Sequence, residues 1–546
     1  MTTNRSLRIE RSSPRQLLAR ILDEPSLVAT VQNLEPRTLG KLINHIGLED
    51  SGEIVSLATT EQIKQIFDDD LWKSERPGKD EAFDADRFAL WLEVMLEAGE
   101  DFVAEKLMEL PEDMVTLALQ RHILVINIDE LQVQMEDRDD DVELVDKALE
   151  SCLYQEFGEY QVISRRHDGW DSIVAILAAL DKNDHELLER ILERCCYMSS
   201  EYIAENGGLY DVLTSEEMLE SDLAADREDR RAGEGFIAPT QAASFLALSR
   251  ATVLDDVLAH PRDPVTRAYF RELAPATKSN GEEAANALPP AGGLVDRTAD
   301  LEQMLGALDA DEVPRDARPV FLLEGKSGTA PAGSVVFKGA LAALHESDPK
   351  LHAARMEEIA YLCNVLGAGC EVDRRSFRPF EAVVAVAATC NLGLEVLTEP
   401  ARGKGEIARR ALSVLTRDGA DKIFRVGWRT LHREVALATC DAVARAFASR
   451  ARKATDPDLR RTFERGEKFV LEKRAQEKPA LARNRLVDLL VDEETRAVLE
   501  GLLGECPVLV GPLTKEKANR YPLDRERQFV ADKSDLGRVR AFLEGL

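Results

Sequence analysis

The chain has 546 residues, of which 44% are hydrophobic, 31% are charged and only 5% are aromatic. This length exceeds what one compact core accommodates, and the composition favours helices over a β-sandwich or barrel. The net charge of −30 is unevenly placed: residues 1–300 carry 30 Lys and Arg against 62 Asp and Glu, whereas residues 301–546 carry 40 against 38. The acidic first half disfavours nucleic acid and anionic membranes and suits basic partners or solubility.

The sequence gives no sign of a membrane or secretory location. The longest apolar runs, Ile173–Leu180 and Ala382–Cys390, are less than half of the ~20 residues that cross a bilayer. Residues 1–22 are basic but lack the apolar core and cleavage site of a secretory signal. The eight cysteines show no disulfide-framework spacing. We therefore expect a cytoplasmic protein without membrane insertion.

Residues 14–210 show the helical period in short segments. In residues 171–180 (DSIVAILAAL) and 183–196 (NDHELLERILERCC) the apolar residues fall on one face of a helix. Asn183 with Glu186 has the spacing of an N-terminal capping pair for the second segment. These patterns predict two antiparallel helices joined by a tight turn.

Two earlier segments, residues 34–48 and 110–124, share a plan in which Leu, acidic and Pro residues precede an apolar-periodic helix. Thr59 with Gln62 predicts a capping box at the start of another helix. Such helix pairs must stack on neighbours to bury their apolar faces. The sequence therefore predicts stacked, superhelix-like helix pairs.

Two segments interrupt the helical pattern of this region. Residues 131–134 (LQVQ) and 160–165 (YQVISR) are rich in strand-forming residues and predict one short β-hairpin. Further on, residues 271–318 turn to Ala, Pro, Gly and Ser, a composition that buries little apolar surface. We predict an acidic helical-repeat domain over residues 1–270, a flexible linker over 271–318 and a second domain over 319–546.

The second domain is predicted to be a helical bundle. Residues 348–369, 378–397 and 421–450 are long, apolar and helically periodic, so they are expected to form its core. Residues 480–546 read as shorter helices broken by prolines. The predicted fold class is thus mostly all-α.

The stretch VFLLEGKSGTA, residues 320–330, resembles part of a phosphate-binding loop. Such a loop needs Gly five residues before the Gly of its Gly-Lys-Ser, and Val320 stands there. Gly and Pro after Lys326 also disfavour the helix that should follow. Residues 322–334 are therefore predicted to be an exposed connection.

Other residue patterns likewise fall short of a chemical site. Asp137–Asp141 could begin a calcium loop, but Val142 and Ala148 stand where Gly and Glu are required. This run is therefore predicted to be a solvated acidic loop, and the same is predicted for Asp68–Asp70. Cys195 and Cys196 continue the apolar stripe of their helix, which predicts core thiols. We predict no catalytic residue, no metal site and no cofactor.

A basic stripe contrasts with the acidic background. Residues 401–470 hold 17 basic against 9 acidic residues, and Trp428 lies beside the stripe itself. Such a stripe could bind phosphate or nucleic acid, or pair with the acidic first half or with local carboxylates. We favour the pairing, and do not expect nucleic acid, because no aromatic residues interleave for base stacking. The stripe consists of four basic residues at the sequence spacings i, i+3, i+7 and i+11, which places them on one face of a helix: Lys422, Arg425, Arg429 and Arg433.

Polar residues inside apolar helices offer an alternative site. Asn364 and Asn391 lie within AYLCNVL and AATCNLGL, and with Cys363 and Arg425 they could form the site of an enzyme of unrecognised helical class. The simpler interpretation, which we favour, is that both asparagines cap or cross-link helices.

Four runs of the sequence resemble an uncharacterised bacterial family, a domain of unknown function, and this likeness extends over most of the chain. It implies no activity. Residues 34–127 also resemble the helical N-terminal domain of MgtE magnesium channels and flagellar-switch superhelices, which implies a curved helix stack acting in regulation or assembly. The channel's membrane segment is lacking, so ion transport is not implied. The four runs are residues 47–72, 358–369, 388–397 and 422–428.

Together these patterns predict a non-catalytic cytoplasmic adaptor or regulatory scaffold that binds other proteins through helical surfaces. Two alternatives remain: an enzyme with its site in the second domain, and nucleic-acid or phosphate binding by residues 401–470.

Overall fold

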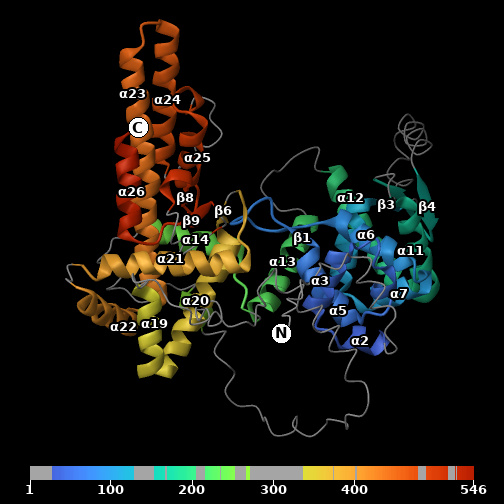
Figure 1. Ribbon diagram of the computed structural model, residues 1–546. Helices are drawn as coiled ribbons and strands as arrows, with labels where there is room; N and C mark the ends of the chain where they lie inside the picture. Colours follow the sequence, from blue (N-terminus) through green and yellow to red (C-terminus); the bar gives the residue numbers. More distant parts are fainter. Residues whose placement is uncertain are drawn as a thin grey trace, which may run out of the picture. The chain divides into compact units, whose positions relative to one another are not determined.

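The protein is mostly helical, as the sequence predicts (Figure 1). The linker at 271–318, the 320–330 stretch, the strand at 131–134 and the acidic run at 137–141 lie outside the residues that the structure describes. The computed structural model describes residues 27–127, 153–165, 169–204, 215–233, 235–251, 266–267, 269–270, 336–372, 374–399, 403–476, 487–514, 523 and 526–546.

These residues form two compact units. The first comprises residues 27–73 and 81–229, and the second comprises 74–80 and the described residues from 230 onward. Helix α14 (Pro239–Ala251) packs on helices of the second unit, although the sequence analysis assigns it to the first domain. The compact units therefore divide about forty residues before the predicted linker.

The first unit is a stack of short helices with small antiparallel sheets. Neighbouring helices pack in pairs, among them α3 on α5, α7 on α11 and α8 on α12. Its helices are α2 (Leu27–Asn33), α3 (Pro36–Ile46), α4 (Gly52–Val55), α5 (Thr60–Asp70), α6 (Ala85–Leu96), α7 (Glu100–Glu109), α8 (Glu112–His122), α11 (Trp170–Asn183), α12 (His185–Ala204) and most of α13 (Ser215–Gly233). Its strands are β1 (Trp72–Lys73), β2 (Ala82–Phe83), β3 (Ile123–Asn127), β4 (Tyr154–Phe157) and β5 (Tyr160–Ser164).

Helix caps in this unit largely follow the sequence. The predicted capping box of Thr59 and Gln62 is confirmed, and the Gln62 amide also donates to the Val31 carbonyl at 2.9 Å, which ties α5 to α2. The predicted cap at Asn183 is wrong by one residue. Asn183 ends α11, and the carboxylate of Asp184 accepts the Leu187 N–H at 3.0 Å. Asp and Asn are equally good caps, so position in the turn decides between them.

The predicted strand at residues 160–165 is confirmed as β5, whereas its predicted partner at 131–134 lies outside the described residues. Strand β5 pairs with β3 on one side and β4 on the other, all antiparallel. The helix predicted within residues 110–124 ends at His122, so Ile123 and Leu124 belong to β3 instead. Ile123, Val125 and Val162 are buried in this small sheet. In this segment the preference of β-branched residues for strands therefore outweighs the helical spacing of the apolar residues.

Local contacts decide two predictions made from the sequence. Asp70 is not solvated as predicted: its carboxylate accepts hydrogen bonds from Arg87 at 2.7 Å and from the Trp91 indole at 2.6 Å, so it links α5 to α6. Cys195 is fully buried and Cys196 nearly so, which confirms both as core thiols.

The second unit is a helical bundle built around α21. The predicted core helices at 348–369 and 378–397 are confirmed within one residue, and residues 421–450 are helical throughout, as the end of α22, a π-helix and most of α23. Its main helices are α14, α19 (Val336–Ser347), α20 (Pro349–Gly369), α21 (Pro379–Leu397), α22 (Lys404–Thr430), α23 (Ala438–Lys453), α24 (Pro457–Ala475), α25 (Glu493–Leu502) and α26 (Lys533–Glu544). Its remaining elements are a π-helix (Leu431–Leu437), 3-10 turns (Val487–Leu489 and Gly511–Leu513), and the hairpins β6 (Glu371–Val372) with β7 (Arg375–Ser376) and β8 (Val508–Val510) with β9 (Arg527–Phe529).

Helix α21 is apolar on nearly all sides. By length and composition it is the one helix in the described ranges that could cross a membrane, yet 72% of that window is buried within the protein. Helices α19, α20 and α22 pack around it. A helix that is hydrophobic all round is typical of the centre of a large core, and this packing accounts for its composition.

Helices α21 and α22 cross with their backbones in contact. A Cβ atom on Gly393 would lie 2.1 Å from the Ile423 carbonyl oxygen, and one on Gly427 would lie 2.0 Å from the Thr389 carbonyl oxygen. Both distances are far below van der Waals contact, so only Gly fits at either position. These two glycines set the closest approach of the two core helices.

Helix α22 is broken at Gly419, which adopts φ 82° and ψ 162°. Arg355 of α20 donates to the carbonyls of residues 415 and 416 at 2.8 and 3.0 Å, and to Glu358 at 2.6 Å. Glu358 in turn accepts the Ala420 N–H at 2.6 Å. This buried ion pair satisfies backbone groups on both sides of the break, which would otherwise each cost about 1–3 kcal/mol.

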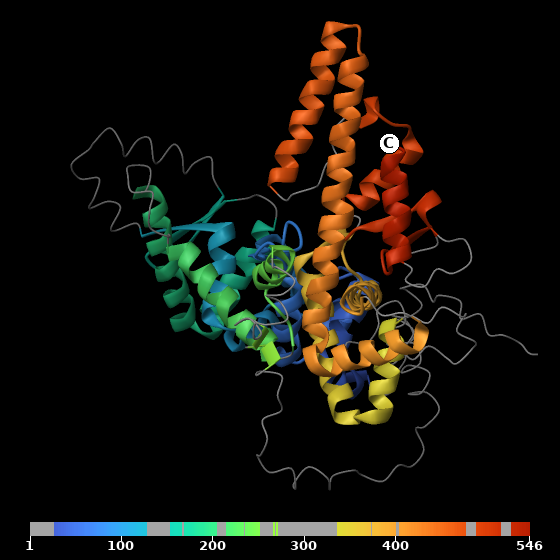
Figure 2. The same ribbon diagram turned by 90° about the vertical axis from the view of Figure 1, so that its left-hand side faces the viewer.

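After the break the chain stays helical to Lys453 and then turns back. The end of α22 continues through the π-helix into α23, and α24 runs antiparallel beside α23. In both views α23 and α24 lie side by side and extend beyond the other helices of the second unit (Figures 1 and 2). We call this helical pair, residues 438–475, the arm. Phe447 and Phe463 pack within it at a ring separation of 6.4 Å.

Replacing Gly427 with Ala is expected to destabilise the protein by about 1–3 kcal/mol or more, because the new methyl group meets the Thr389 carbonyl and forces α21 and α22 apart. Urea unfolding followed by circular dichroism measures the change. The control is Gly405→Ala, also in α22, where no atom lies within 4 Å. That variant should be neutral or more stable by up to about 1 kcal/mol. Equal stability of the two variants would contradict the backbone contact.

Candidate functional site

The candidate site residues all lie in the second unit. Asn391, in the middle of α21, is 2% exposed. Its side-chain oxygen accepts the Phe337 N–H at the start of α19 at 3.0 Å, and its amide donates to the Ala531 carbonyl at 2.8 Å. One side chain therefore joins α21 to α19 and to the segment before α26. This geometry is that of a cross-link between helices.

Asn364 lies on α20 and is half-buried. Its amide donates to the Gly235 carbonyl and to the Tyr269 hydroxyl, the latter at 3.1 Å. Burial, the largest influence, raises the pKa of Tyr269 to about 12 even though the Asn364 hydrogen bond lowers it. Asn364 and Asn391 bond to different groups, so the structure does not bring the two asparagines together on a common set of partners.

Glu395, one turn after Asn391, is the carboxylate closest to this cross-link. It accepts the Lys533 N–H at the first turn of α26 at 2.9 Å and approaches the Asn391 amide at 3.4 Å. Burial raises the pKa of Glu395 above its ordinary value, against the opposing effect of the Lys533 N–H. Glu395 belongs to no sequence motif, although its spacing of four from Asn391 places both on one helix face.

The predicted basic stripe follows one face of α22 and enters the π-helix. Lys422, Arg425 and Arg429 are half-buried, and Arg433 is exposed. The Arg425 guanidinium lies 4.4 Å from the centre of the Phe245 ring. Burial lowers the pKa of Arg429, and the positive charge of Arg433 lowers it further. The stripe is thus partly covered by α14 rather than open along its length.

Trp428 is almost fully buried, 1% exposed, and stacks on Phe424 at 5.7 Å. The guanidinium carbon of Arg250 lies 5.6 Å from the centre of its ring. No aromatic residue of the stripe is therefore exposed for base stacking, since its only tryptophan is inside the bundle.

The end of the arm carries basic side chains outside the predicted stripe. Seven basic residues and three acidic ones lie between residues 445 and 465. Of these bases only Arg461 forms an ion pair within the described chain, at 3.5 Å to Asp458, where both side chains are more than 70% exposed. The bases are Arg445, Arg450, Arg452, Lys453, Arg460, Arg461 and Arg465. We call this group the arm tip.

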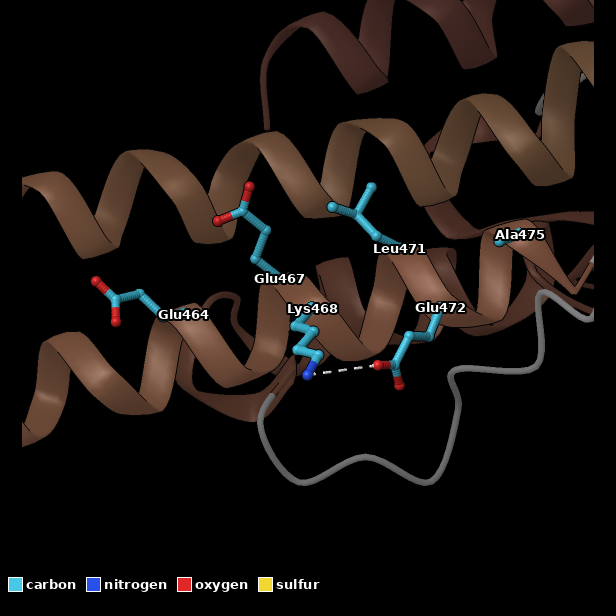
Figure 3. A pocket seen from close by; sticks show the side chains of 6 residues that line it. All are labelled: Glu464, Glu467, Lys468, Leu471, Glu472 and Ala475. Atoms are coloured by element: carbon cyan, nitrogen blue, oxygen red, sulfur yellow. Dashed lines mark ion pairs between the residues drawn. The ribbon is translucent and has the colours of Figure 1, made fainter.

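A surface groove follows α24 near the base of the arm (Figure 3). It is lined by Leu471, by acidic side chains such as Glu464 and Glu467, and by Lys468, which pairs with Glu472 at 3.9 Å. Leu471 is 44% exposed. The groove is therefore a mixed-charge helical surface, typical of a contact with another protein rather than of an enclosed ligand site.

The first unit presents an acidic helical surface. Glu186, Glu189 and Glu193 are exposed on α12 at i, i+3 and i+7, which places them on one face. Nearby Tyr160 is shielded from solvent, and this burial, with the surrounding carboxylates, raises its pKa to about 12.

Cysteine and metal chemistry receive little support from the described residues. All seven described cysteines are free thiols, and burial raises the pKa of six of them. No group of three or more His, Cys, Asp or Glu side chains in the described ranges is placed to hold a metal ion.

Replacing Glu395 with Gln should change the pH dependence of stability. The folded state holds the Glu395 proton more tightly than the unfolded state, so the stability it contributes is present below about pH 4.5 and is lost as pH rises through the raised pKa. Gln stays neutral and avoids that loss. The free energy of unfolding should therefore be measured for both proteins from about pH 4 to 7. The value for Glu395→Gln minus the value for wild type should increase as the pH rises.

Glu399→Gln, which changes a 69%-exposed carboxyl beside the same Lys533, is the matched control and should show the smaller trend. A stability difference between Glu395→Gln and wild type that does not vary with pH would refute the burial argument.

Comparison with known proteins gives a family match over the first part of the chain and no activity. No curated protein and no solved structure matches the chain. The likeness to MgtE channels and the extension of the family resemblance to residues 358–428 thus remain predictions. The run at residues 47–72 lies inside the range that is matched. Residues 2–206 of this chain match the model described as "Family of unknown function (DUF6178)".

Proposed function

We propose that this protein is a non-catalytic cytoplasmic adaptor or regulatory scaffold, and that it contacts its partner protein through the arm. The observation that carries the proposal is the arm tip. Its bases lie at the end of two helices that extend beyond the bundle, and carboxylates of the described chain leave most of them unneutralised. Unpaired surface charge of one sign steers a partner of opposite charge.

The interior of the second unit supports binding over catalysis. The side chains of Asn391, Asn364, Arg355 and Glu358 all form hydrogen bonds with backbone groups or with other side chains of the second unit. Groups committed in this way hold helices at fixed positions. An enzyme site would instead direct polar groups toward a space that a substrate could enter.

The partner surface is expected to be acidic. The arm tip has an excess of positive charge, whereas the groove along α24 is rich in Glu. A partner with an acidic patch for the tip and basic residues for the groove would match the arm. Free thiols in the described chain agree with the reducing cytoplasm proposed as its location.

The double variant Arg452→Glu, Lys453→Glu is expected to lose the partner. Both side chains are exposed on the last turn of α23, so charge reversal repels an acidic surface without touching the core. Affinity capture from the source cells, quantified by mass spectrometry, should recover at least about tenfold less partner than wild type, equivalent to about 1.4 kcal/mol.

Arg409→Glu, Arg410→Glu is the control, because it reverses two adjacent exposed bases on α22 away from the arm. It should retain the partner. Thermal unfolding checks that both variants are folded. Undiminished capture by the tip variant, or equal loss in the control, would overturn the proposal.

Nucleic-acid binding is the second candidate, and the same tip favours it. Seven bases within about twenty residues at the end of a projecting helical pair could follow a phosphate backbone. The absence of exposed aromatic residues among the described residues 445–465 argues for backbone contact without base stacking.

Fluorescence anisotropy with labelled single-stranded and duplex DNA and RNA tests this candidate. If it is correct, log affinity falls linearly with log salt, and the tip variant shows a slope smaller by about one to two phosphate contacts. The Arg409→Glu, Arg410→Glu variant should leave that slope unchanged. A salt-insensitive signal, or an unaltered slope in the tip variant, would exclude the candidate.

A further inference from the structure

One face of α24 is closed by α23, its neighbour in the arm. Phe463, Gly466 and Val470 are buried on this face, at the spacings i, i+3 and i+7. A Cβ atom on Gly466 would lie 2.5 Å from the Phe447 ring, so the two helices of the arm are in close contact there. Close packing of this kind holds the opposite face of α24 in a fixed orientation.

The opposite face of α24 is exposed from one end of the helix to the other (Figure 3). Its residues recur every three or four positions, which places them in one line on a helix. The ion pairs within this face join Arg461 to Asp458 at 3.5 Å and Lys468 to Glu472 at 3.9 Å. Exposed pairs of this kind contribute little, so the charges remain available to another molecule. We call this the outer face, and it consists of Pro457, Arg461, Glu464, Lys468, Leu471, Glu472 and Ala475.

The charges of α24 change sign about the middle of the helix. Gly466 is the central residue of α24. On the outer face Glu464 lies two residues before it and Lys468 two residues after it, and Arg461 and Glu472 flank them in the same sense. The helix is therefore complementary in charge to a copy of itself that runs in the opposite direction. Four pairs of charged residues lie at equal distances from Gly466, each of opposite sign and none of like sign: Arg465 with Glu467, Glu464 with Lys468, Arg460 with Glu472, and Asp458 with Arg474.

We propose that the outer face binds the outer face of a second copy of this chain, with the two α24 helices antiparallel about a two-fold axis at the level of Gly466. Residues equally far from that level then face each other, so Glu464 meets Lys468 of the second copy. Arg461 meets Glu472 of the second copy with an offset of one residue, about 1.5 Å along the helix. Each contact occurs twice, because a two-fold interface is formed by the same surface of both copies.

The uncharged residues of the outer face fit the same arrangement. Pro457 faces Ala475 of the second copy at each end of the contact, where small side chains let the helices approach. Leu471, which is 44% exposed, lies at the level of Arg461 and can cover the aliphatic part of that side chain. A parallel arrangement would instead place Glu464 beside Glu464 and Lys468 beside Lys468, and like charges in contact disfavour it.

This inference concerns a different part of the arm from the tip variant of the proposed function. The outer face lies on α24, and the second copy supplies the basic residues that fit the groove there. Arg452 and Lys453 lie on α23. Self-association is measured on the purified protein alone, so its outcome is independent of whether the arm tip binds an acidic partner.

Sedimentation velocity of the purified full-length protein tests the proposal. Contact through one helix face gives a small interface, so a monomer–dimer equilibrium is expected at concentrations of about 1–100 µM. Salt should weaken it, because the contacts are exposed ion pairs. Lys468→Glu brings carboxylates of the two copies together at two places and should weaken the dimer about tenfold or more. Lys350→Glu, which changes an exposed lysine on α20, is the control and should dimerise as wild type does.

A charge exchange identifies the second copy as the occupant. The double variant Glu464→Lys, Lys468→Glu restores opposite charges between two copies of itself, so its dimer should recover to near the wild-type affinity. A surface elsewhere on the chain would not recognise the exchanged charges. Thermal unfolding checks that every variant is folded. The proposal is overturned by a wild-type protein that stays monomeric over the whole concentration range, by an unchanged dimer in Lys468→Glu, or by a double variant that remains as weak as the single one.

Discussion

The contact between the backbones of α21 and α22 is the constraint on which the second unit depends. At Gly393 and Gly427 no side chain separates the two helices, so α21 lies deeper against α22 than any larger residue would permit. This depth explains why α21 is apolar around nearly its whole circumference. It also fixes the face of α22 that turns toward α14, where Phe245 meets Arg425 and Arg250 meets Trp428.

Polar groups in this core serve the same close packing. The break at Gly419 lets α22 change direction beside α20, and the buried pair of Arg355 with Glu358 compensates the backbone groups that the break exposes. Asn391 fastens α21 to α19 and to the chain before α26. Breaking a buried pair of this kind commonly costs about 3–5 kcal/mol, so these residues are explained by stability alone. The arm, by contrast, carries its charge away from the core.

Much of the fold follows from sequence periodicity, and the remainder depends on contacts that periodicity does not encode. The long helices at 348–369 and 378–397 are predicted within a residue because each has a cap or Pro at its start. The predicted start at Asp421 matches the break at Gly419, which the Asp-Gly pair at 418–419 signals. Two-residue hairpins such as β6 with β7 have too little sequence to be recognised.

The candidate site was predictable in part. The helix face of Lys422, Arg425, Arg429 and Arg433 is seen in the sequence, but its partial cover by α14 is not, because that requires a tertiary contact across about 180 residues. The roles of Gly393 and Gly427 are hidden for the same reason, since a glycine in a helix has no local signature of its partner. Arg250 lies in the region that the sequence analysis gives to the first domain.

We propose the arm as the surface that meets other molecules. Lysine-directed cross-linking in the source cells, followed by mass spectrometry of the captured protein, tests this most directly. The account predicts that intermolecular cross-links concentrate on Lys453, Lys468 and Lys473 of the arm. Intermolecular cross-links confined to lysines of the first unit, such as Lys64 and Lys182, would contradict it.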